Sequence, residues 1–182
     1  SLHGRKIGVP ANFYFESLHP EVEAATRAAL AQMELLGAEL IEVTVPDIEE
    51  FNLIARLIQI AEASSVHVNN LDSRREDYGD DQQTLLDQGR FVTAVDYLNA
   101  QRRRRQLNGE FYELFDQVDA LAAPAVAILP AKIGQNSVVV NGIEVDVRMM
   151  TTRNARALNM TGLPLLSLPC GLSESGLPIG IQ

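Results

Sequence analysis

The side chains that could act as nucleophiles in this chain stand apart from the groups that would activate them. Ser64-Ser65 is the only serine pair, and it has no glycine neighbour. It therefore lacks the sharp turn that exposes a nucleophilic serine, and we expect it on a helix surface. Cys170 has no histidine nearby in sequence. Because a reactive thiolate needs a base or a positive charge, we expect Cys170 to serve in packing.

Potential bases and metal ligands are equally scattered. The only lysines, Lys6 and Lys132, do not adjoin a serine. The three histidines are His3, His19 and His67, and none has a histidine or cysteine partner three or four positions away. Zinc sites need clustered nitrogen and sulfur ligands. Glycine-rich nucleotide-binding patterns are also missing. We therefore expect no metal and no cofactor.

Four consecutive arginines, Arg102 to Arg105, are the one concentration of positive charge. On a helix, successive side chains point about 100° apart, so these four cannot form one flat phosphate-binding face. The chain carries a net charge of −9, which argues against nucleic-acid binding. We expect ion pairs with the chain's own carboxylates. Arg104 lies on an apolar stripe, so it needs a buried partner or faces something that the chain does not contain.

The first half of the chain alternates strand and helix signals. Residues 6–10 read as a strand that ends at Pro10, and Pro20 suits the first turn of a helix that Gly37 ends. Residues 39–45 form the next apolar run. This order predicts a right-handed parallel βαβ unit. The following segments are predicted as a helix over 47–69, an acidic loop over 72–81, helices over 84–90 and 93–118, and a buried strand from 121.

The second half begins with an irregular apolar loop between Pro124 and Pro130. Residues 138–147 then predict a β-hairpin, because Asn141-Gly142 between β-branched runs is typical of a type I′ turn. The remaining predictions are a helix over 151–159, a strand over 165–168, a turn over 173–176 and a last strand over 177–182 that pairs back on the preceding one.

Composition places the chain among globular proteins. It has 182 residues, of which 46% are hydrophobic and 21% charged, a length that fits about one domain. A single cysteine excludes an internal disulfide, so we expect a reducing compartment and a cytoplasmic location. No run of about 20 apolar residues suggests a membrane span. The chain starts without Met and stops in an apolar run, so we expect residues 1–182 to be a single domain or a fragment of a larger one.

Several segments, in order, resemble amidase signature hydrolases. The match begins with the strand around Lys6-Ile7-Gly8-Val9-Pro10 and continues through the long helix and the proline-rich loop. Its most specific part is the run from Asn159-Met160-Thr161-Gly162 to Pro169-Cys170-Gly171 and then Gly176 to Gln182. The resemblance covers nearly the whole chain. It implies an α/β fold with a mixed β-sheet flanked by helices on both faces.

The resemblance also implies a chemistry that this chain does not carry. Members of the family hydrolyse amides through a Ser-cisSer-Lys triad and an acyl-enzyme, and backbone amides stabilise the oxyanion. The serine-rich signature and the lysine strand precede the segment seen here, and nothing in the sequence matches either. Ser64-Ser65 is not that motif, so no catalytic residue is carried over. We expect this chain alone to be inactive and to need the missing N-terminal amidase segment as a partner.

The resemblance implies a part of the substrate pocket. The candidate substrate-binding residues are Val126, Ile128, Thr152, Arg153 and Asn159, which lie in or near the proline-rich loop and before the Asn-x-Thr-Gly-x-Pro run. Asn159 and Thr161 could instead cap a helix end, and Val126 and Ile128 could be core residues. The expected ligand is a small-molecule amide, with no nucleic acid and no membrane. An alternative function is a non-catalytic binding or assembly module. Independently of the function, missing sheet neighbours would expose apolar surface and strand edges, so we expect self-association into a homo-oligomer.

Overall fold

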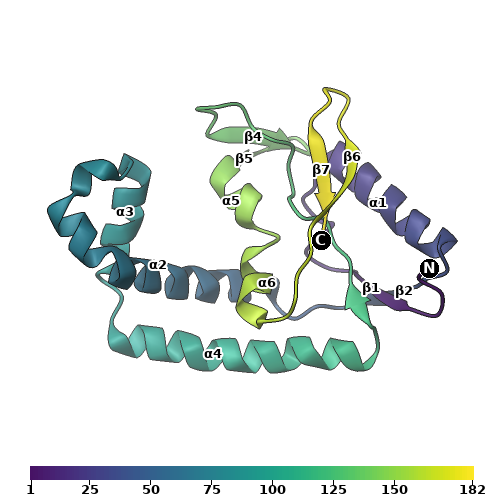
Figure 1. The fold of residues 1–182 in the computed structure, drawn as a ribbon, viewed down its shortest axis with the longest axis horizontal. Helices are drawn as coiled ribbons and strands as arrows, with labels where there is room; N and C mark the ends of the chain where they lie inside the picture. The colour runs from purple at the N-terminus through teal and green to yellow at the C-terminus, as the bar shows by residue number, and fades with distance from the viewer. The chain divides into compact units, whose positions relative to one another are not determined.

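The computed structural model describes residues 1–182 and divides into two compact units (Figure 1). One unit comprises Ser1–Ile48 and Gly109–Gln182 and contains all the strands, so we call it the sheet unit. The other, Glu49–Asn108, is helical throughout its regular parts, and we call it the helical unit. Each is described by itself.

The sheet unit opens with the predicted βαβ arrangement. Strand β1 (Lys6–Pro10) is followed by α1 (Pro20–Leu35) and β2 (Glu39–Val43). The two strands are parallel, with Lys6 opposite Glu39. Gly37 has a φ of 96°, a left-handed conformation that glycine adopts readily after the end of a helix. The parallel pairing and the helix end are therefore confirmed.

Strand β3 (Ala120–Leu121) adds to the other edge of β1, also parallel, and gives the order β2-β1-β3. Asp119 fixes its start, since its backbone N–H donates to the Lys6 carbonyl at 2.8 Å while its Oδ2 accepts from the Lys6 N–H at 2.8 Å. This hydrogen bond and the nearby Arg5 lower the pKa of Asp119. The predicted strand is thus confirmed. It begins at Ala120, one residue earlier than predicted, and is two residues long.

Two antiparallel hairpins complete the strands. In β4 (Ser137–Val140) and β5 (Ile143–Asp146), the turn residues Asn141 and Gly142 have φ of 51° and 81°, the positive values of a type I′ turn. This hairpin is confirmed. The last strands, β6 (Leu168–Leu172) and β7 (Pro178–Ile181), also pair as predicted.

Two boundaries in this half were predicted wrongly. The strand predicted over 165–168 instead begins at Leu168, as β6. Leu168 lies opposite Ile181, the last residue of β7, so the residues before Leu168 have no residue of β7 to pair with. The single helix over 151–159 is split into α5 (Val147–Thr152) and α6 (Arg156–Thr161). Between them Asn154 turns inward and donates to the Pro124 carbonyl, a contact that a continuous surface helix would not make.

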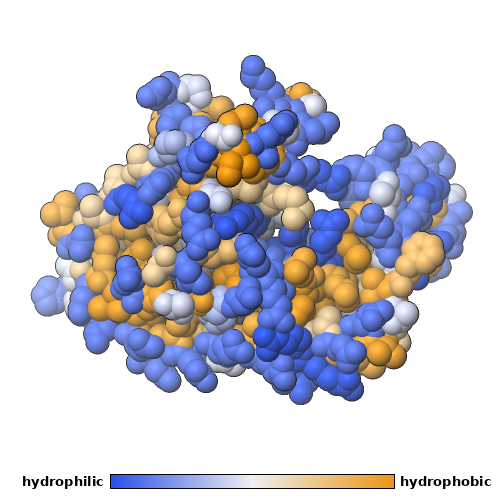
Figure 2. Space-filling view, turned by 180° about the vertical axis from the view of Figure 1, so that it is seen from behind, coloured by the Kyte–Doolittle hydropathy of each residue, from blue (hydrophilic) through white to orange (hydrophobic).

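The core of the sheet unit lies between α1 and the strands. One cluster gathers Leu18, Val22, Ala127, Ile128, Val140, Met150 and Ile179, and a second gathers Ile7, Leu30, Ala122 and Ile181. Cys170 on β6 packs against both clusters, and burial raises the pKa of its thiol. The expected packing role of Cys170 is confirmed. Apolar side chains also remain at the surface, where Figure 2 shows orange areas among the hydrophilic ones.

The helical unit contains most of two antiparallel helices, α2 (Ile48–Ser73) and α4 (Ala94–Tyr112). Ile48 of α2 and residues 109–112 of α4 belong to the sheet unit. Arg103 makes a bidentate ion pair with Glu50, at 2.7 and 2.6 Å, and this hydrogen bonding lowers the pKa of Glu50. Tyr97 donates to Glu62 at 2.7 Å. The expectation that the arginines pair with the chain's own carboxylates is confirmed at Arg103. Arg104 is half-buried and donates to the Gln101 amide oxygen at 3.4 Å.

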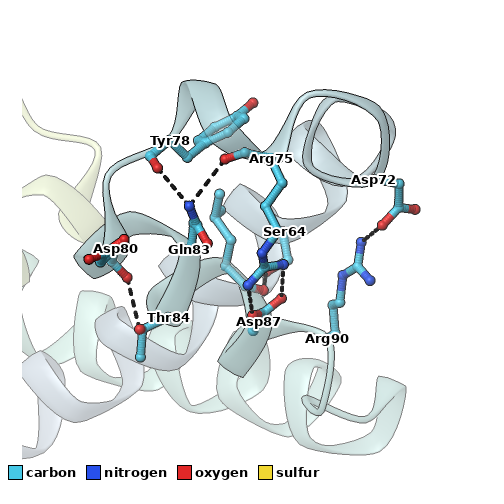
Figure 3. Close-up of polar contacts among 10 residues, drawn as sticks. Ser64, Asp72, Arg75, Tyr78, Asp80, Gln83, Thr84, Asp87 and Arg90 are labelled. Atoms are coloured by element: carbon cyan, nitrogen blue, oxygen red, sulfur yellow. Dashed lines mark hydrogen bonds and ion pairs between the residues drawn. The ribbon is translucent and has the colours of Figure 1, made fainter.

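The predicted acidic loop over 72–81 is wrong. It contains the end of α2, a short 3₁₀ turn (Arg75–Asp77) and the start of α3 (Asp80–Gly89), as Figure 3 shows. Arg75 pairs with Asp87 and Arg90 with Asp72. Within the acidic run itself, Arg90 offsets Asp72 and Arg74 offsets Asp77, so ordered structure tolerates the charge. The long helix predicted over 93–118 ends at Tyr112, followed by a 3₁₀ turn (Glu113–Asp116).

Ser64 lies inside the helical unit rather than on its surface, which corrects the expectation for half of the serine pair. It is 6% exposed, and its hydroxyl donates to the Leu86 carbonyl on α3 (Figure 3). Gly89 allows this close approach, because a Cβ there would stand 2.1 Å from both the Ile60 carbonyl oxygen and Ser64 Oγ. Ser65 is exposed as expected. No helix is both long and apolar enough to cross a membrane.

Candidate functional site

The candidate site lies where β1 and β3 end. Because these neighbouring strands are parallel, the loops that follow Pro10 and Leu121 leave the sheet at the same edge. Ligands of α/β proteins bind preferentially beyond the carboxyl ends of parallel strands. Phe13 of the first loop, the Pro124 carbonyl of the second loop and side chains of the α5–α6 connection make contacts here.

Phe13, in the loop after β1, has a left-handed backbone, with φ of 63°. For a bulky residue this conformation costs of order 1–3 kcal/mol, and only surrounding contacts maintain it. The Phe13 N–H donates to Glu16 Oε1 at 2.7 Å, and its carbonyl accepts from Arg153 Nη1 at 2.9 Å. The side chain is buried. The loop is therefore fixed in one shape by hydrogen bonds at both ends of the residue.

Arg153, a residue predicted from the family resemblance, is the central side chain of the site. Its guanidinium carbon lies 3.7 Å from the centroid of the Phe13 ring, in a cation–π contact. Its Nη1 also lies 3.5 Å from the side-chain oxygen of Asn154. Arg153 thus joins the end of α5 to the loop after β1. Its positive charge is half-buried and locally oriented.

Asn154 and Gln182 form a polar junction that the sequence reasoning missed. Asn154 is fully buried, and its Nδ2 donates to the Pro124 carbonyl at 3.0 Å. Gln182 Nε2 donates to the same carbonyl at 3.1 Å and to the Asn154 carbonyl at 3.0 Å. These contacts hold the loop after β3 beside Arg153. Nothing in the local sequence signals them, because the partners are far apart along the chain.

Tyr14 is the second residue that the prediction left out, although the aromatic run at Phe13 to Phe15 is visible in the sequence. Its side chain is 1% exposed, and its hydroxyl has no hydrogen-bond partner. Burial raises the pKa of Tyr14, and the charge of Arg153 opposes this only in part. The phenol is therefore a neutral group and not a base at ordinary pH.

The other predicted substrate residues differ in their surroundings. Val126 is 36% exposed in the loop after β3, whereas Ile128, two positions on, is 4% exposed in the core cluster. Thr152 ends α5, where its Oγ1 accepts from Arg156. Asn159 is exposed on α6. The structure therefore brings Arg153 to the strand ends and places Ile128 within the core.

The residues at this edge can bind and orient, but they form no bond-breaking set. The Asn154 and Gln182 amides already donate to backbone carbonyls, and the Tyr14 phenol is enclosed, while the Arg153 guanidinium is half-buried. Lys6 starts β1 and so lies at the opposite end of that strand. Acyl transfer needs a nucleophile beside its base.

Comparison with known proteins finds similarity along the whole chain. The Amidase family model matches residues 1–182. An amidase of Pseudomonas putida is 41% identical over 177 residues, which are 97% of this chain and 38% of that protein. A glutamyl-tRNA(Gln) amidotransferase subunit of Myxococcus xanthus is 32% identical over an alignment of 208 residues, covering 100% of this chain and 41% of that protein. The chain thus spans about two fifths of the length of these relatives.

Solved structures agree with the sequence relatives. A crystal structure of an amidase superposes with a TM-score of 0.90 at 26% identity, covering 98% of this chain and 41% of the other. A protein described as part of a vestigial complex related to an s-triazine catabolic enzyme gives a TM-score of 0.88 at 27% identity, covering 100% of this chain and 39% of the other. The mixed α/β architecture expected from the resemblance is that of these neighbours. With a family match over its full length, the chain belongs to the Amidase family.

Proposed function

We propose that this chain contributes the scaffold and one wall of the substrate pocket to an amidase that hydrolyses a carbon–nitrogen bond. The observation that carries this proposal is the contrast between fold and site. The chain reproduces two fifths of a solved amidase at a TM-score of 0.90, while its strand-end site offers binding groups and no nucleophile with a base. The groups that perform acyl transfer then belong to the part of the fold that this chain does not contain.

In the proposed reaction, a serine of the missing N-terminal segment attacks the amide carbonyl and forms an ester bond to the enzyme. The carbon–nitrogen bond breaks and the amine leaves with a proton that the lysine and bridging serine relay. Water then cleaves the ester and releases the acid. This chain's proposed role is to hold the substrate, with Arg153, Val126, Thr152 and Asn159 as residues that line its pocket. Ile128 supports that wall from the core.

The direct test is an assay of the chain alone and in combination. We expect the purified chain to hydrolyse no member of a panel of aliphatic and aromatic amides. A chimera that joins it to the remaining part of the Pseudomonas putida amidase should restore turnover. In that chimera Arg153→Ala should raise KM more than it lowers kcat, with Arg105→Ala, a change at an exposed arginine of α4, as the control. Turnover by the chain alone would refute the proposal.

A chimera that folds and binds amides without hydrolysing them would instead favour the binding or assembly module.

The single cysteine supports a reducing compartment, and we place the protein in the cytoplasm on that basis. A cytoplasmic location is checked by fractionating cells that express the natural gene.

A further inference from the structure

Strand β2 ends the three-stranded sheet of the sheet unit, because the strand order is β2-β1-β3. On its inner side, the Glu39 N–H donates to the Arg5 carbonyl, and the Val43 carbonyl accepts from the first residue after β1, both at 2.8 Å. Alternate residues of a parallel strand bond to the same neighbour. The backbone groups of Leu40 and Glu42 therefore point to the outer side of β2, where no strand lies. An uncovered edge of this kind accepts a further strand.

The backbone of β2 does not block such an addition. Its five residues pair with β1 in unbroken register, so the strand contains no bulge. It also contains no proline, and the first one after it is Pro46. The charges of Glu39 and Glu42 remain as the features that control pairing. They repel an acidic strand and attract a basic one, so they select among partners instead of excluding all of them.

A cavity of about 420 Å³ lies beside this edge, between α1 and the two strands β1 and β2. Val9, Leu30 and Leu40 give part of its lining an apolar character. Glu34 of α1 and Glu42 of β2 also line it. Both glutamates are exposed, and neither carboxylate has an ion-pair or hydrogen-bond partner within the chain. The cavity therefore presents two uncompensated negative charges beside an apolar wall.

Arg27 is the only cationic residue in the lining, and its charge is already engaged. Its guanidinium pairs with Glu23, one turn earlier on α1, at 2.8 Å. The guanidinium carbon also lies 5.0 Å from the centroid of the Phe15 ring. A lysine or arginine side chain from outside complements this lining. Its apolar stem can pack along the wall while its charged head reaches the free carboxylates.

We propose that β2 is a docking edge for an extended basic segment of another protein, which adds as a strand and places a lysine or arginine side chain between Glu34 and Glu42. Backbone hydrogen bonds to Leu40 and Glu42 supply affinity. Successive side chains of a strand point to opposite faces, so every second residue of the added strand faces the cavity. The partner is therefore recognised by basic residues at alternate positions. Docking at β2 is independent of the reaction proposed above.

A second copy of this chain does not fit this edge. Pairing two β2 strands brings Glu39 and Glu42 of one copy close to the same residues of the other, and like charges on neighbouring strands are destabilising. The net charge of −9 on each chain adds to the repulsion. A dimer that forms through β2 is accordingly an outcome that would count against the proposal.

The probe is a fluorescein-labelled octapeptide of alternating valine and lysine, titrated with the purified chain and followed by fluorescence anisotropy. The test variant is Glu34→Gln with Glu42→Gln. The matched control, Glu113→Gln with Glu174→Gln, changes the net charge equally at exposed glutamates outside the cavity lining. Urea unfolding verifies that both variants fold. We expect the Kd to rise at least fivefold with the test variant and less than twofold with the control, and an octapeptide of alternating valine and glutamate should not bind.

Two further measurements separate strand addition from simple charge attraction. Glu42→Pro removes an N–H that faces outward, so it breaks no bond to β1 and should bind the probe more weakly than Glu42→Gln. In the wild type, saturating probe should slow amide hydrogen exchange at Leu40 and Glu42 and leave the β6 amides unchanged. Equal effects of the test and control variants, no binding by the folded wild type, protection confined to β6, or a wild-type dimer that Glu42→Pro abolishes would each overturn the proposal.

Discussion

The guanidinium of Arg153 lies over Phe13 with its carbon 3.7 Å from the ring centroid, and it donates to the carbonyl of the same residue at 2.9 Å. One side chain therefore holds both the ring and the backbone of Phe13, whose φ of 63° needs such support. The contact joins two segments 140 residues apart. It links the loop after β1 to the end of α5.

Replacing Arg153 by alanine should destabilise the sheet unit. The variant loses a cation–π contact and a charged hydrogen bond, which together contribute about 1–3 kcal/mol. Arg153→Lys keeps the charge but loses the planar fork, so its stability should lie between those of wild type and alanine. Urea unfolding measures both, with the exposed Arg105→Ala as the control. If Arg153→Ala unfolds at the wild-type urea concentration, the contact does not support the loop.

Tyr14→Phe, in contrast to Arg153→Ala, should increase the stability of the chain. The Tyr14 hydroxyl is buried with no partner, and an unsatisfied buried polar group costs about 1–3 kcal/mol. Removing the oxygen leaves the ring in place, so the free energy of unfolding of the chain should rise, again measured in urea. The change breaks no hydrogen bond that this chain makes. A clear decrease would mean that the hydroxyl has a partner in solution.

The acid limb of stability should depend on Asp119. The Lys6 N–H and Arg5 lower the pKa of this carboxyl in the folded state. Its contribution is therefore fully present above the unfolded pKa, near 4, and is lost as pH falls through the lower folded value. The difference in stability between wild type and Asp119→Asn should be largest near neutral pH and shrink at more acidic pH. Asp116→Asn, in the turn just before, is the control.

Because the Asp119 carboxyl is exposed, salt provides a second check. The Arg5 contribution should weaken at high ionic strength, whereas the hydrogen bond from Lys6 N–H at 2.8 Å should persist. A pH-independent difference between the two proteins would show that the asparagine acts only through its shape.

Much of the sheet unit could be predicted because its signals are local. Asn141-Gly142 carries the conformation of its hairpin in two residues, and Gly37 ends α1 by its own backbone freedom. The helical unit is harder to predict where its structure depends on contacts between residues far apart in the sequence. The acidic composition of residues 72–81 predicts a loop, but Asp72 pairs with Arg90, 18 positions away. No local pattern contains that pairing.

The candidate site also combines a residue that the sequence predicts with contacts that it does not predict. Arg153 was reached only through the family resemblance, and the residues that fix its surroundings were not predicted. Asn154 donates to a carbonyl 30 positions away, and Gln182 to one 58 positions away. Their amides carry no sequence signature of burial. Tyr14 was visible as one of three aromatic residues, but the sequence cannot tell that its hydroxyl is enclosed.

Two glycine substitutions should separate packing from helix propensity in the helical unit and at its border. Gly89→Ala would place a Cβ 2.1 Å from the Ile60 carbonyl oxygen and from Ser64 Oγ. Helix α3 would have to move off α2 and break the Ser64–Leu86 hydrogen bond, a loss of about 1–3 kcal/mol. Gly109→Ala, on α4, meets nothing within 4 Å, so the better helix former should raise stability by about 0.5–1 kcal/mol. Urea unfolding of the two variants measures whether each raises or lowers the free energy of unfolding. Stabilisation by both would show that α3 does not pack on α2 through Gly89, while destabilisation by both would show that a contact at Gly109 forms in solution.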